Sequence, residues 1–160
     1  MMAHRGIATL AAALMLCFLV LSYFEPEFFM LHLYQSLIYL AIILLLFYAE
    51  DQYAYMLGMV APAMWLLLTY STGLLQGAAR QVGRLLHAQR PSNQVTLIAA
   101  VTAVLAVLLI AFCGYRWKRE FSGLGRGRST FLVSFGIVVV YYAILVVWFW
   151  HWIPHGVATG

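Results

Sequence analysis

Hydrophobic residues form five long runs along this chain, and charged residues gather in the short stretches between them. The runs cover residues 7–24, 28–48, 53–75, 95–115 and 130–152, and none of them contains Asp, Glu, Lys or Arg. About 20 apolar residues in a helix cross the roughly 30 Å of hydrocarbon in a bilayer. A helix also satisfies its own backbone hydrogen bonds inside lipid. Each run therefore predicts a transmembrane helix.

The stretch at residues 76–90 follows a different pattern, in which apolar positions recur every three to four residues. The apolar positions of this region are Leu75, Ala78, Ala79, Val82, Leu85 and Leu86, and the polar ones are Gln76, Arg80, Gln81, Arg84 and Gln89. This division is typical of an amphipathic helix that lies at the membrane surface. The same residues also fit a simple extension of the third span into water.

Together these patterns predict an all-α fold, a polytopic integral membrane helix bundle with about five transmembrane helices and one amphipathic interfacial helix. We expect a single domain over residues 1–160. The breaks at residues 25–27 and 50–51 are so short that the first three spans should pack as antiparallel hairpins. The first run resembles a secretory signal peptide, but no small-residue cleavage motif follows it, so we expect a retained helix.

A glycine and a proline interrupt the third run at Gly58 and Pro62. Transmembrane helices tolerate both residues, and a small residue lets a neighbouring helix approach closely. A helix broken at this point to expose backbone for ion binding is the alternative. We favour the close approach, because nothing else in the runs indicates a broken helix.

The composition agrees with a membrane location and excludes a water-soluble fold. Hydrophobic residues make up 65% of the 160 residues and charged residues 9%, against about 45–50% and about 25% in soluble domains. Nine basic and five acidic residues give a net charge of +4. Base-stacking aromatic residues between the basic groups are few, so no nucleic-acid partner is expected.

The distribution of the nine basic residues predicts the orientation, because cytoplasmic loops are enriched in Lys and Arg. Arg5 and the five basic residues of the 115–130 region would lie on one side, and the three arginines of residues 76–90 on the other. We therefore expect a cytoplasmic N-terminus and an external C-terminus, in the cytoplasmic (inner) membrane of a bacterium.

The lack of charged residues within the spans disfavours an ion-coupled transporter, since such proteins need ionisable groups at membrane depth. The sequence has no Ser-His-Asp or HExxH arrangement and no metal-type cysteine pair, so it does not predict an enzyme. Glu25 and Glu27 precede His32, but their spacing matches no established metal site.

Candidate binding residues are instead a few polar side chains in the second and fifth runs. His32 and His151 are predicted to lie near the same membrane face, where they could ligate a haem or a pigment or bind a quinone together with Gln35 and Tyr141. The alternative is that the two histidines are interfacial residues and that Gln35 and Tyr141 join neighbouring helices.

Basic residues near the ends of the runs are predicted to contact anionic lipid headgroups or a partner protein. They are Arg80, Arg84, Arg116, Lys118, Arg119, Arg126 and Arg128. Beyond the lipid bilayer itself, we expect other membrane protein subunits as partners.

Three function classes remain compatible with the sequence. The first is a non-catalytic integral membrane subunit that packs within a larger energy-transducing or transport complex, which apolar spans and 16% aromatic residues favour. The second is a small membrane redox module that binds haem, pigment or quinone through its histidines. The third is a channel or facilitator for a neutral solute.

Overall fold

The computed structural model describes residues 2–48, 51–87, 94–121 and 127–149, and these residues form helices joined by short turns. The elements are α1 (Met2–Phe24), the short 3-10 helix η1 (Pro26–Phe28), α2 (Phe29–Tyr48), α3 (Asp51–Ser71), α4 (Leu74–Leu86), α5 (Gln94–Phe121) and α6 (Gly127–Phe149). All except η1 and α4 are long and apolar enough to cross a membrane. The chain is therefore a multi-pass integral membrane protein with the predicted all-α bundle.

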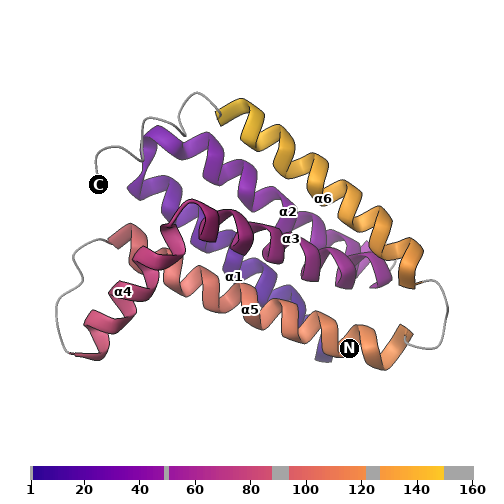
Figure 1. Cartoon of the computed structure of the whole chain (residues 1–160). Coiled ribbons are helices and arrows are strands. Elements are labelled where there is room, and N and C mark those ends of the chain that lie inside the picture. Colours follow the sequence, from indigo (N-terminus) through magenta and orange to yellow (C-terminus); the bar gives the residue numbers. More distant parts are fainter. Residues whose placement is uncertain (1, 49–50, 88–93, 122–126, 150–160) are drawn as a thin grey trace.

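The five long helices run up and down in one bundle, with α6 along one edge and α4 across one end (Figure 1). The helix α1 packs against α2 and α5, whereas α3 packs against α5, α6 and α2. At the centre, the ring of Phe18 stacks on Tyr39 and meets Trp65 edge-on, with 5.6 Å between ring centroids in both pairs. These buried rings fill the space between α1, α2 and α3.

Several helix bounds differ from the predicted spans. The first helix begins at Met2 and α5 continues to Phe121, both beyond the apolar runs. Lys118 and Arg119 in the last turn of α5 interact favourably with the helix dipole, so the helix continues past the hydrophobic stretch. Conversely, α3 ends at Ser71, four residues before the predicted end at residue 75.

A turn at Gly73 separates α3 from α4, so the amphipathic segment does not extend the third span. Gly73 has a φ of 77°, which only glycine adopts without strain. Its amide donates a hydrogen bond to the Tyr70 carbonyl at 3.1 Å, which closes the end of α3. The helix α4 then packs against α5 and α3 through a face that includes buried Ala78 and Gln81. Residues 88–90 of the predicted segment lie outside the described residues.

The predicted close approach at Gly58 is confirmed. A Cβ atom at this position would lie 2.6 Å from the Cys113 sulfur, so a side chain at Gly58 would collide with α5. Pro62 lies inside α3, which continues without interruption through both residues. The alternative of a broken third span is therefore wrong, and the glycine instead lets α3 and α5 pack closely.

Candidate functional site

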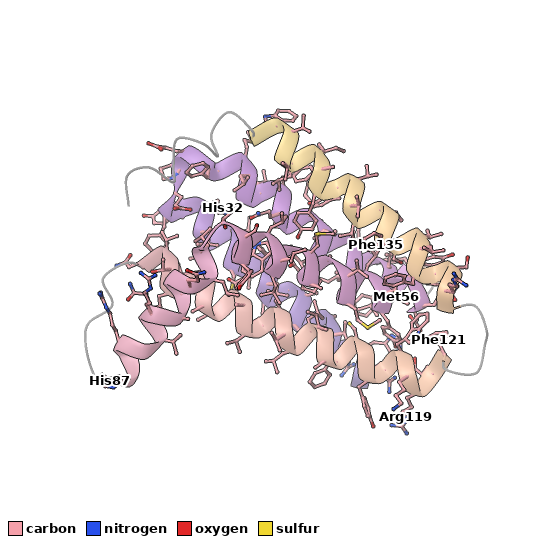
Figure 2. The ribbon with its side chains drawn as sticks, viewed as in Figure 1. His32, Met56, His87, Arg119, Phe121 and Phe135 are labelled. Carbon is pink, nitrogen blue, oxygen red and sulfur yellow. The ribbon has the colours of Figure 1, made fainter. Side chains whose placement is uncertain are left out.

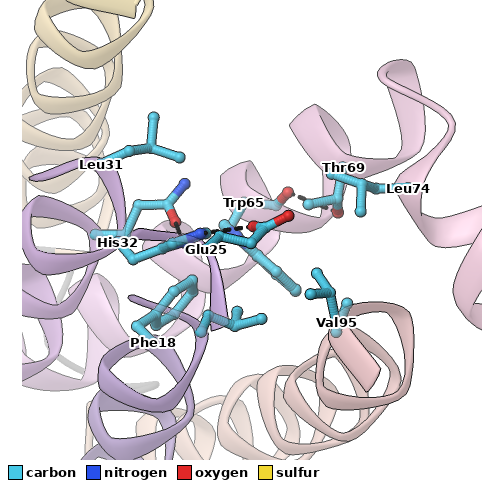
Figure 3. Close-up of a pocket in the computed structure, with 11 residues that line it drawn as sticks. Phe18, Glu25, Leu31, His32, Trp65, Thr69, Leu74 and Val95 are labelled. Atoms are coloured by element: carbon cyan, nitrogen blue, oxygen red, sulfur yellow. Dashed lines mark hydrogen bonds and ion pairs between the residues drawn. The ribbon is translucent and has the colours of Figure 1, made fainter. Parts of the chain in front are cut away.

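A small polar cluster lies where α1 ends and α2 begins, and His32 is at its centre (Figure 3). The imidazole is buried, with 7% of the residue exposed. Its Nε2 atom lies 3.0 Å from the Glu25 carboxylate, and its Nδ1 atom lies 3.4 Å from the Gln35 side-chain oxygen. Both ring nitrogens therefore have protein partners.

Local chain geometry brings these three side chains together. His32 and Gln35 are three residues apart in α2, so they lie on the same helix face. Glu25 occupies the turn between α1 and η1, where its amide donates to the Leu21 carbonyl and its own carbonyl accepts from Phe28, both at 2.9 Å. Pro26 follows at the first position of η1, which suits its fixed φ. The turn thus directs Glu25 back over the first turn of α2.

The direction of the hydrogen bonds at His32 depends on which of its ring nitrogens carries hydrogen. When the imidazole is protonated, both of its N–H groups donate, one to the Glu25 carboxylate and one to the Gln35 oxygen. When it is neutral, it donates to Glu25 through Nε2, and the Gln35 amide can rotate to offer its NH₂ group to Nδ1. The arrangement therefore satisfies the buried imidazole in either charge state.

The cavity beside the cluster is small, with a volume of about 80 Å³. Its wall includes Trp65 and Thr69 from α3, Leu74 from α4 and Val95 from α5. Ligand pockets typically measure about 300–1,000 Å³, whereas one water molecule in the liquid takes about 30 Å³. This cavity has room for water but not for a haem or another pigment. Since an iron ligand also needs a free ring nitrogen, the geometry at His32 does not favour haem binding.

Tyr141, another predicted cofactor residue, lies away from His32. Tyr141 in α6 stacks on Tyr34 in α2, with 4.3 Å between ring centroids. The Tyr34 hydroxyl donates to the Tyr141 carbonyl at 3.2 Å, and the Tyr141 hydroxyl donates to the Tyr34 carbonyl. This reciprocal pair joins α2 to α6, and Tyr141 does not line the cavity beside His32. His151 lies outside the described residues.

The predicted basic residues lie at both ends of the bundle. Figure 2 labels Arg119 at the end of α5, and α4, which carries Arg80 and Arg84, lies at the opposite end near the labelled His87. On α4, Arg80 and Arg84 are exposed. At the opposite end, the exposed basic side chains are Lys118, Arg119 and Arg128, whereas Arg116 is half-buried and forms an ion pair with Glu120. Arg126 lies outside the described residues.

Sequence reasoning missed the hydrogen bond between Glu25 and His32, which it considered only as part of a metal site. Among the described residues, no three His, Cys, Asp or Glu side chains come together as metal ligands would. The sequence does contain a feature that could have indicated this contact. His32 lies about one turn into the second span, and Glu25 precedes it in a short turn that contains Pro26. Tyr34, the partner of Tyr141, was also missed because nothing in its spacing distinguishes it from other aromatic residues.

The far end of the bundle holds a second set of polar contacts. His4 in α1 lies 3.6 Å from the Asp51 carboxylate in α3, and its ring lies beside that of Tyr55. Tyr55 also meets Phe121 of α5 edge-on. These contacts connect three helices at that end. An open groove of about 330 Å³ lies beside His4 and is lined also by Arg5, Leu46 and Phe47. Comparisons of the chain with protein-family models, with curated proteins and with solved structures gave no match.

Proposed function

We propose that this protein is a non-catalytic subunit of a larger membrane complex, of the energy-transducing or transport type, in the cytoplasmic membrane of a bacterium. The observation that carries the proposal is the outward face of α6. This helix packs mainly against α3 through one narrow buried stripe, namely Thr130, Ser134, Val138, Tyr142 and Leu145.

Opposite the buried stripe, exposed residues of α6 repeat every seven positions. Small residues occupy Ser129, Gly136 and Ala143, and valines occupy Val133, Val140 and Val147. We call these six residues the outer seam. Spacings that alternate between four and three residues place all six on one side of a helix, in the heptad pattern of packed helices. Nothing within the bundle lies within 4 Å of a Cβ built on Gly136.

Such a repeat suits contact with another transmembrane helix better than contact with lipid. Small residues let two backbones approach closely, which gives dispersion contacts and weak hydrogen bonds that lipid chains do not supply. Valine loses little side-chain entropy on packing, because its χ1 angle is already restricted in a helix. Lipid imposes no seven-residue order on the side chains that it covers. The outer seam therefore supports a partner helix along α6.

The filled interior supports a role without catalysis or transport through the bundle. Phe18, Tyr39 and Trp65 occupy the centre of the bundle. The hydroxyls of Thr69 and Thr102 donate to carbonyls of their own helices, at 2.9 and 2.8 Å, and so do not face a polar path. In this proposal the cytoplasmic end carries the N-terminus, and the exposed basic residues contact anionic headgroups at the two membrane faces.

The test is purification in a mild detergent followed by native mass spectrometry. We expect a complex that contains at least one different membrane protein in fixed ratio. A photo-crosslinking residue at Val140 should attach to that protein, and Gly136→Leu should release it by holding the helices apart. The matched control is Ala111→Leu, an exposed small residue on α5, which should leave the complex intact. A monomer or a pure homo-oligomer under these conditions would overturn the proposal.

A further inference from the structure

A wholly apolar groove of about 400 Å³ runs between α3, α5 and α6. The helix α3 supplies its floor, which includes Met59, Ala63 and Leu67. Ile110 of α5 lines one side, and Phe131 and Phe135 of α6 line the other. Figure 2 shows Phe135 on α6 facing the α3 side of the bundle. The groove is distinct from the outer seam, which lies on another side of α6.

The groove exists because α5 and α6 both pack against α3 but hardly touch each other. Ala63 is small and exposed, so its side chain does not fill the space between the two neighbouring helices. Phe131 and Phe135 stack on each other with 5.7 Å between ring centroids, which makes their side of the groove a continuous aromatic surface. Along α3 it extends from Met59 to Leu67, nine residues that span about 12 Å of helix.

One end of the groove leads to a basic, aromatic rim. Arg128 precedes Phe131 by three residues and Phe135 by seven, so all three lie on the same face of α6. Arg128 is exposed, and the structure shows it in no ion pair with another described residue. Beside it, Trp117 of α5 packs against Gly127, 3.4 Å from a Cβ built there. Tryptophan and arginine are typical of the headgroup level of a membrane protein.

A second groove of about 410 Å³ lies on the other flank of α6, beside Tyr34 and Val140. It has a similar size and is also largely apolar, and neither groove has a basic residue in its lining. Arg128, however, lies on the face of α6 that borders the first groove, opposite the face that borders the second. The two grooves therefore differ chiefly in the charge at the rim. A positive charge at the rim of the first groove favours a ligand with an apolar chain and an anionic headgroup. We propose that the groove between α3, α5 and α6 binds an acyl chain of an anionic phospholipid, whose phosphate lies beside Arg128. This inference extends the headgroup contact proposed above for the basic residues and does not depend on the complex.

The test uses the purified full-length chain in detergent and native mass spectrometry with added phosphatidylglycerol or phosphatidylcholine of identical acyl chains. We expect more phosphatidylglycerol than phosphatidylcholine to remain bound. Arg128→Gln should reduce the phosphatidylglycerol affinity about fivefold, since one basic residue contributes about 1 kcal/mol to headgroup attraction. It should leave phosphatidylcholine binding almost unchanged. Arg84→Gln, at the opposite end of the bundle, is the charge control.

Ala63→Trp tests the acyl-chain half of the site, because the indole would fill the floor of the groove. It should reduce binding of both lipids, whereas Val140→Trp, beside the second groove, should not. Far-UV circular dichroism and thermal unfolding confirm that each variant folds. The inference is overturned if Arg128→Gln and Arg84→Gln have equal effects, or if Ala63→Trp and Val140→Trp do. Failure to find a protein partner would leave these results unaffected, and so distinguishes the two proposals.

Discussion

Single polar residues within the spans mostly bond to the backbone of their own helix. Ser22 donates to the Leu19 carbonyl at 2.6 Å, and Ser36 donates to the Leu33 carbonyl at 2.7 Å. Sequence reasoning expects such groups to join neighbouring helices. A hydroxyl can instead reach a carbonyl three or four residues earlier, at no cost in helix packing. Longer side chains can bridge helices, as Tyr34 and Tyr141 do.

The His32 cluster leads to a prediction about stability. His32→Ala should lower the free energy of unfolding by about 1–3 kcal/mol, because Glu25 and Gln35 lose a buried hydrogen-bonding partner. Glu25→Gln should cost less, since an amide oxygen can still accept from Nε2. The measurement is unfolding with SDS in mixed micelles, followed by circular dichroism. Glu27→Gln is the control, because this exposed neighbour in the same turn should have no effect. Equal losses for Glu25→Gln and Glu27→Gln would contradict the contact.

The contact between Gly58 and Cys113 gives a second residue-scale prediction. Gly58→Ala should destabilise the protein by about 1–3 kcal/mol through overpacking, since the new methyl group would lie 2.6 Å from the Cys113 sulfur. In a Cys113→Ala background the same change should cost much less, because the sulfur is gone and the Cys113 Cβ lies at 3.7 Å. A double-mutant cycle from SDS unfolding measures this compensation. Purely additive effects would show that the two residues do not limit the approach of α3 to α5.

At the scale of elements, the runs of apolar residues predict which segments are helical but not where each helix ends. Hydropathy marks the part of a helix inside the hydrocarbon, whereas the end is decided by local groups such as Gly73 after α3 or Lys118 and Arg119 in α5. The same limit explains why extension of α3 and a separate α4 fit the sequence equally well. The sequence shows a glycine at position 73 but not its φ angle, and it is the φ angle that distinguishes a turn from a continuous helix.

The turn at Gly73 is testable by substitution. Gly73→Ala should cost about 1–2 kcal/mol, because a φ of 77° places Cβ close to the following carbonyl. Gly83→Ala, in the interior of α4, should instead stabilise the protein by about 0.5–1 kcal/mol, since it restricts the unfolded chain. At neither position does a neighbouring group lie within 4 Å of the new methyl group, so the two changes in stability report backbone conformation and not packing. Changes of the same sign in SDS unfolding would contradict the left-handed turn.

For the whole molecule, the sequence predicts the fold class well and the site poorly. Five spans follow from hydropathy because the solvent is lipid and every backbone group must bond within a helix. The neighbours of each helix do not follow, since lipid-facing and core-facing positions are equally apolar. Thus Phe135 at the groove and Val140 on the outer seam look alike in sequence. The approach of Glu25 to His32 also depends on a turn geometry that no periodicity reveals.

Orientation is the whole-molecule property that the charges predict. Helix α1 begins at the same end of the bundle as α6, and α6 ends at the other. Six of the nine basic residues belong to the end that we assign to the cytoplasm. Alkaline phosphatase, which is active only outside, should therefore be active when fused to the C-terminus, and green fluorescent protein fused there should stay dark. Fusions within residues 122–126 should give the reverse. An active phosphatase at residues 122–126 would invert the topology.

The length of α5 sets how far its charges stand from the membrane. The helix has 28 residues, and its last six, residues 116–121, follow the apolar run. At 1.5 Å per residue they raise its end by about 9 Å along the helix axis, which is close to the Debye length of about 8 Å at physiological salt. Lys118 and Arg119 therefore lie on a helical extension beyond the hydrocarbon, where an approaching molecule meets their electric field early. We therefore expect these charges to act mainly on the rate at which an acidic surface is encountered, and added salt should lower that rate.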